Sequence, residues 1–254
     1  MSPRPAAPLP RFAAALAFLL LPGLAMTASA QSSPSAERGT LLSVTGRLRW
    51  RLVGRAAAIT TVTATHADTC DLSNSGGPSA TVIIARVKGP VVEYLVLADS
   101  TLLIREGDRV HAITDGREAA VGRTYRSAMD SQWNGTVAHE AALGNYIRAL
   151  RAHRNTKDGF WVASSDPAAA EEAITGRCPV ANIATIALLS DGATRLVDRF
   201  GILTWAQVLS LTELPHGPRR LIEQTREAES SDTAGVRWPR GKVSDDASIV
   251  ILKY

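Results

Sequence analysis

The stretch TVIIARVKGPVVEYLVLADSTLLIREGDRVHAI, residues 81–113, decides the predicted fold class. It contains four runs rich in Val, Ile and Leu, at 81–87, 91–97, 101–104 and 109–113. Lys88-Gly89-Pro90 separates the first two runs, and Glu106-Gly107-Asp108 separates the last two. Turn-forming residues between short apolar runs predict β-hairpins. Two successive antiparallel hairpins argue against a doubly wound parallel sheet.

The sequence after residue 130 predicts helices and two further strands. Helical periodicity, or signals for a helix start and end, mark four segments: 137–151, Asp166 to Gly176, Thr204 to Glu213, and a helix opening at Pro218. Apolar runs at 183–189 and 248–252 predict strands. This order of strands, helices and mixed elements indicates an α+β domain.

The positive charge of the chain is confined to its beginning. The 254 residues carry a formal net charge of +4. Residues 1–55 hold seven arginines and one acid, Glu37, whereas the remainder holds 21 basic and 23 acidic residues. The main part of the chain is therefore slightly acidic, and no nucleic-acid partner is predicted.

The first thirty residues have the pattern of a secretory signal peptide. Arg4 and Arg11 precede an apolar run of fifteen residues, 12–26, and Ala28-Ser29-Ala30 predicts cleavage after Ala30. The run is shorter than the roughly 20 residues that span a bilayer, so no stable membrane span is predicted. The alternative is an alanine-rich N-terminus that is never cleaved.

Three segments follow from this division: a signal-like segment at 1–30, a linker of unassigned structure at 31–55, and one domain at 56–254 that begins with a short helix over 56–67. An oxidising compartment would permit Cys70 and Cys178 to pair, although two unrelated thiols explain them equally well.

Two acidic motifs lie at strand ends. Ser190-Asp191-Gly192 follows the apolar run 183–189, and Asp245-Asp246-Ala247-Ser248 leads into the last run. Carboxylates in such positions suit Mg²⁺ or Mn²⁺, which prefer hard oxygen ligands. The alternative is a turn and a solvated loop. The basic run Arg237 to Lys242 likewise suits either a phosphate-binding or a solvated loop.

These motifs resemble those of type 2C metal-dependent serine/threonine protein phosphatases, in particular a bacterial branch. That family has a strand ending in Ser-Asp-Gly, and a last-strand motif of Asp-Asn or Asp-Asp followed by Thr or Ser. Its Gly-Asp-Ser turn between two central strands is matched by Ala98-Asp99-Ser100. The resemblance extends over about 200 residues in the expected order.

The resemblance implies a layered sandwich of two antiparallel sheets flanked by helices, here expected to lack its first strands. It implies Asp191 and Asp245 as ligands of Mn²⁺ or Mg²⁺, in a family that uses a two-metal site. Gly192, Asp246 and Asp99 would lie beside these ligands, with Asp99 holding a turn. No catalytic residue is assigned. A phosphoprotein is the implied substrate, whereas the oligomeric state is not predicted.

One part of the family pattern is missing. The family's first half supplies an acidic motif and an Asp-Gly-His-Gly-like segment whose Asp bridges the two metals, but the only acid between Met1 and Ala67 is Glu37. We therefore expect a phosphoserine/phosphothreonine phosphatase-like protein with impaired activity. The alternative is a catalytically inactive phosphatase-like binding protein or a truncated remnant. The signal-like segment predicts export, whereas the resemblance favours a cytoplasmic location.

Overall fold

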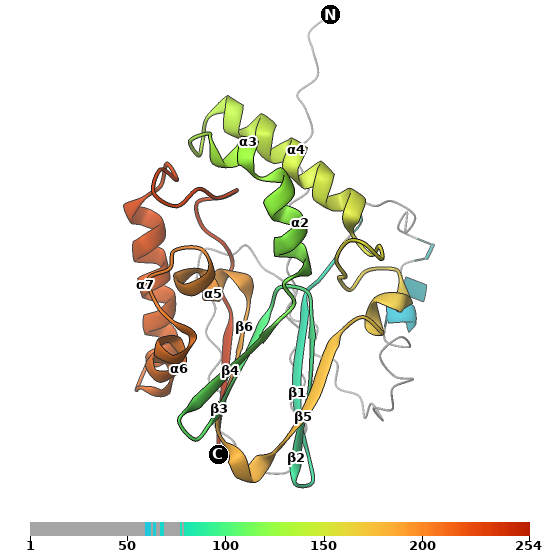
Figure 1. Cartoon of the computed structure of the whole chain (residues 1–254), viewed down its shortest axis with the longest axis vertical. Coiled ribbons are helices and arrows are strands. Elements are labelled where there is room, and N and C mark those ends of the chain that lie inside the picture. Colours follow the sequence, from blue (N-terminus) through green and yellow to red (C-terminus); the bar gives the residue numbers. More distant parts are fainter. Residues whose placement is uncertain (1–58, 62, 65–66, 69–76, 78) are drawn as a thin grey trace, which may run out of the picture.

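The computed structural model describes residues 59–61, 63–64, 67–68, 77 and 79–254. In this part of the chain the strands form two antiparallel sheets, flanked by helices (Figure 1). The small sheet has the order β1-β2-β5, with bounds Val82–Lys88, Val91–Leu97 and Ile174–Pro179. The large sheet has the order β4-β3-β6-β7, with bounds Arg109–Thr114, Thr101–Glu106, Ile183–Leu189 and Ile249–Lys253. The fold is therefore α+β, as predicted.

The main core lies between the two sheets. Ile83 and Val96 of the small sheet belong to the same buried cluster as Leu102, Ile186 and Val250 of the large sheet. Because alternate side chains of a strand point to opposite faces, one apolar set per strand fills this layer. Each fully buried Ile, Leu or Val side chain contributes about 1.5–3 kcal/mol to folding. The link between β2 and β3, residues 98–100, crosses from one sheet to the other.

Helices cover the outer face of the large sheet and one end of both sheets. Helices α5 (Asp191–Asp198), α6 (Trp205–Glu213) and α7 (Gly217–Ser231) bury the outer side chains of β6 and β7. Helices α2 (Arg117–Tyr125), α3 (Ser127–Asp130) and α4 (Val137–His153) lie beyond the strand ends at which β2 leads into β3 (Figure 1). Two short 3₁₀ helices, η1 (Pro167–Ala170) and η2 (Val180–Asn182), flank β5.

Most of the predicted elements are confirmed. Both hairpins form, β1 with β2 and β3 with β4. The helix predicted over 137–151 is α4, and the two later helices are α6 and α7. Helix α6 begins at a capping box of Thr204 and Gln207, a start signal that its sequence contains. The strand predictions at 183–189 and 248–252 correspond to β6 and β7.

The helix predicted from Asp166 to Gly176 is wrong. Asp166 does accept a hydrogen bond from the Ala168 amide at 2.9 Å, but the turn that it caps ends at Ala170. The chain then becomes β5, in which Gly176 is paired with Tyr94 of β2. A Cβ atom at Gly176 would lie 2.2 Å from the Tyr94 hydroxyl oxygen, so the glycine makes room for a tyrosine of the neighbouring strand.

Several predictions lie outside the described residues. These are the signal-like segment, the linker at 31–55, and Cys70, so the pairing of Cys70 with Cys178 stays a prediction. Of the helix predicted over 56–67, residues 59–61 and 63–64 are helical. Among the described helices, none has both the length and the apolar character needed to cross a membrane.

Candidate functional site

The two acidic motifs lie side by side at one end of the large sheet. Strands β6 and β7 pair in antiparallel fashion, so Leu189 at the end of β6 lies opposite Ile249 at the start of β7. The Ser190 hydroxyl donates to the Asp246 carbonyl oxygen at 3.2 Å and accepts from the Ser248 amide at 3.0 Å. Strand pairing and Ser190 therefore bring together two motifs that are more than fifty positions apart.

Gly192 lies directly against the second motif. A Cβ atom there would lie 2.2 Å from the carbonyl oxygen of Asp246, a clash with backbone that no rotamer change relieves. The absence of a side chain at Gly192 thus allows α5 to begin close to the loop that carries Asp245. Asp246 contributes its main chain to this contact, and its side chain is exposed.

Asp191 and Asp245 form the centre of the candidate site. Their carboxyl groups lie close enough for the negative charge of Asp245 to act on Asp191. Burial raises the pKa of Asp191 well above its ordinary value, and the charges of Asp99 and Asp245 raise it further. The structure therefore brings both predicted ligands together in a place where negative charge accumulates.

Asp99 belongs to the same group of carboxylates. Burial raises its pKa to about 7, and nearby acids, among them Glu118 and Asp245, add to the shift. Its Oδ1 atom is buried and has no hydrogen-bond partner. The preceding Ala98 has φ +67°, a left-handed conformation that costs a non-glycine residue about 1–2 kcal/mol. Asp99 was expected to hold a turn beside the metal ligands, and its unpartnered buried oxygen is a feature that a turn alone does not explain.

Glu118 is a fourth acid of this region that the sequence analysis missed. It lies in the first turn of α2. Burial raises its pKa to about 7, the charge of Asp191 raises it further, and Arg154 opposes the shift. Its signal in the sequence is weak, because an acid in the first turn of a helix is common for reasons of helix capping alone.

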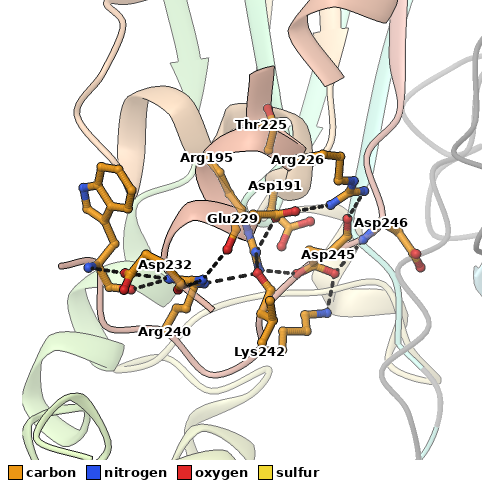
Figure 2. Close-up of polar contacts among 12 residues, drawn as sticks. Asp191, Arg195, Thr225, Arg226, Glu229, Asp232, Arg240, Lys242, Asp245 and Asp246 are labelled. Atoms are coloured by element: carbon orange, nitrogen blue, oxygen red, sulfur yellow. Dashed lines mark hydrogen bonds and ion pairs between the residues drawn. The ribbon is translucent and has the colours of Figure 1, made fainter. Parts of the chain in front are cut away.

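A network of arginines and one buried glutamate fixes the loop that carries Asp245 (Figure 2). Arg195 of α5 donates to Asp245 Oδ2 at 3.2 Å and to Glu229 Oε1 of α7 at 2.7 Å. Arg226 donates to Glu229 Oε2 at 2.6 Å and to the Asp245 carbonyl oxygen at 2.5 Å. Glu229 thereby holds the guanidinium groups of Arg195 and Arg226 against Asp245.

The basic run 237–242 is not fully solvated, because Arg240 is buried, whereas phosphate binding by the run stays a prediction. Arg240 is buried and donates to the carbonyl oxygens of Trp238 at 2.8 Å, Glu229 at 3.1 Å and Val243 at 3.1 Å. Lys242 forms an ion pair with Asp245 Oδ1. Arg240 therefore stabilises the loop, and Lys242 balances the charge of Asp245.

The donor atoms at this site suit Mn²⁺ or Mg²⁺ in kind. Asp191, Asp245 and Asp99 offer carboxylate oxygens, and the unpartnered Oδ1 of Asp99 is the observation that fits a cation ligand. Within the described part of the chain, however, no three Asp, Glu, His or Cys side chains are gathered closely enough to form a complete metal cluster. Asp245 instead forms ion pairs with Arg195 and Lys242.

Several solved structures match this chain at low sequence identity. A bacterial serine phosphatase matches with 11% identity and a TM-score of 0.44, over 79% of this chain and 67% of that one. PppA, a regulatory component of T6SS in Pseudomonas aeruginosa, matches with 13% identity, a TM-score of 0.42, and 80% and 67% of the two chains. A serine-threonine phosphatase 2C from Toxoplasma gondii matches with 12% identity, a TM-score of 0.43, and 77% and 64% of the two chains.

This chain thus spans about two thirds of the length of the matched proteins. No family model matches the sequence, and no curated protein does. Similarity at this level says nothing about activity, so the function must be argued from the residues of the site.

The raised pKa of Glu118 predicts a pH-dependent stability of the metal-free protein. A folded-state pKa near 7, above the ordinary 4.5, stabilises the fold below about pH 4.5, and this stabilisation is lost as the pH rises through 7. The neutral variant Glu118→Gln should therefore be more stable than the wild type at pH 8, by about 1 kcal/mol. Urea denaturation in EDTA at pH 5.5 and pH 8 measures this difference.

The matched control is Glu140→Gln, at an exposed position in the first turn of α4. It should leave the difference between the two pH values unchanged. Identical pH dependence in the wild type and Glu118→Gln would show that Glu118 is not held in a charge-disfavouring environment.

Proposed function

We propose that this chain is a phosphoserine/phosphothreonine protein phosphatase that depends on Mn²⁺ or Mg²⁺ and has reduced activity. The observation that carries the proposal is the proximity of Asp191 and Asp245, which lie beside the paired ends of β6 and β7, together with the unpartnered Asp99 oxygen. Burying several acids in one place is costly, and a bound cation is the usual compensation.

Asp191, Asp245 and Asp99 are the residues that would hold the metal. A divalent ion bound here would lower the pKa of a water molecule and neutralise charge on a phosphoryl group. The protein's own contribution is to desolvate Asp191 and to anchor Asp245 through Arg195. The choice of phosphoserine and phosphothreonine rests on the resemblance of the motifs at 190–192 and 245–248 to those of type 2C phosphatases.

A second candidate function is binding of a phosphoprotein without turnover. It is favoured by the ion pairs of Asp245 with Lys242 and Arg195, because a carboxylate already neutralised by two cations is a weaker metal ligand. The single acid among residues 1–67, Glu37, favours it as well, since no bridging carboxylate is evident there.

The test is phosphate release by the purified full chain. Peptides that carry phosphoserine, phosphothreonine or phosphotyrosine are incubated with Mn²⁺, with Mg²⁺ or with EDTA. We expect release from the first two peptides with Mn²⁺ and none in EDTA. No release at millimolar Mn²⁺ would overturn the proposal, and binding of the phosphopeptides without release would establish the second candidate.

A further inference from the structure

Lys242 makes an unusual contact with a predicted metal ligand. Its ammonium group is ion-paired with Oδ1 of Asp245, and Asp245 is 9% exposed whereas the Lys242 side chain is 53% exposed. A flexible, largely solvated side chain therefore brings its charge to a carboxylate that is otherwise removed from water. Figure 2 shows the Lys242 side chain reaching Asp245 from the loop below it.

Both carboxylate oxygens of Asp245 are occupied. Oδ1 accepts from the Asp246 amide at 2.9 Å as well as from Lys242, and Oδ2 accepts from Arg195 at 3.2 Å. A metal ion placed on this carboxylate must share or replace one of these donors, because two cations in contact with the same oxygen repel each other strongly.

Lys242 and Arg195 differ in how firmly they are held. Arg195 is buried, and it also donates to Glu229 at 2.7 Å and to the Val243 carbonyl oxygen at 3.2 Å. Moving Arg195 would break that set of contacts. Lys242 is the cation that can leave at lower cost, because its side chain is 53% exposed and can return to water, whereas Arg195 is buried.

We propose that the Lys242 ammonium is an internal counter-ion of the Asp191–Asp245 pair, and that a divalent cation displaces it on binding. In the metal-free protein Lys242 reduces the repulsion among the acids. Because a divalent cation must displace it, Lys242 also weakens metal binding. The displacement step rests on the proposed function, whereas the counter-ion role in the metal-free protein does not.

The experiment compares the wild type with Lys242→Gln and Lys242→Arg in the full chain. Thermal unfolding in EDTA measures the counter-ion role, and the electron paramagnetic resonance signal of free Mn²⁺ measures binding. We expect Lys242→Gln to lower Tm in EDTA by about 2 °C and to bind Mn²⁺ roughly fivefold more tightly. Lys242→Arg, which keeps the charge, should resemble the wild type in both measurements.

Lys88→Gln is the matched control, because it makes the same charge change at an exposed position, the last residue of β1, beside the start of β2 and at the other end of that strand from Asp99. It should alter neither measurement. An unchanged Tm of Lys242→Gln in EDTA would overturn the counter-ion role. Equal Mn²⁺ affinity in all four proteins would show that Mn²⁺ binds at the site without displacing Lys242, which would overturn the displacement step but not the metal site. If none of the four binds Mn²⁺, both the displacement and the proposed function are wrong.

Discussion

Replacing Asp191 with Asn is expected to reduce Mn²⁺-dependent phosphate release by on the order of 100-fold. Asn has almost the same shape but cannot carry the negative charge that attracts a divalent cation. Burial, and then the charges of Asp99 and Asp245, raise the pKa of Asp191, so its negative charge is unfavourable in this position. The same substitution should therefore raise the Tm of the protein in EDTA while it abolishes the rise in Tm that Mn²⁺ produces.

This opposite effect on stability and activity separates a metal ligand from a structural residue. Loss of a structural contact would lower both the Tm in EDTA and the activity. The control is Asp108→Asn, an identical change at the exposed turn between β3 and β4. It should leave both quantities within experimental error. Wild-type activity in Asp191→Asn would remove Asp191 from the site.

Glu229→Ala is expected to destabilise the protein by about 3 kcal/mol, because removing one partner leaves buried charges uncompensated. Glu229 is 1% exposed and accepts from both Arg195 and Arg226. Since the same two arginines hold Asp245, the loop of the candidate site should loosen as well. Urea denaturation gives the loss of stability, and Mn²⁺ affinity reports on the loop.

Glu223→Ala on the same helix is the matched control. Glu223 also pairs with an arginine, Arg219, at 2.7 Å, but the two side chains are 52% and 67% exposed. An exposed pair of this type contributes at most about 0.5 kcal/mol. Equal losses of stability in Glu229→Ala and Glu223→Ala would mean that burial does not make the Glu229 network important.

Local sequence signals were sufficient for the hairpins and for α6. Gly89 and Gly107 both have positive φ, at +58° and +55°, which is the conformation that the turns at 88–90 and 106–108 require. The capping box of Thr204 depends on two residues three positions apart, so it is visible without tertiary information. The segment 166–176 was mispredicted because its helix signals are local and its pairing with β2 is not.

The residues of the candidate site also differ in whether a local sequence signal identifies them. Asp191 and Asp245 stand out because each is part of a motif at a strand end, and pairing of β6 with β7 then brings the motifs together. Glu118 and Lys242 belong to no such motif. Their proximity to the site depends on how α2 and the loop before β7 pack, which is a property of the folded chain alone.

The link that crosses between the sheets gives the core a role in the spacing of the acids. Asp99 follows a strand of the small sheet, whereas Asp191 follows a strand of the large one. The side chains between the sheets, such as Val96 and Ile186, therefore act as the spacer that sets how far apart these two acids lie. A change of volume in that layer, made far from either acid, would therefore change their separation and, under the proposed function, the size of cation that they could share.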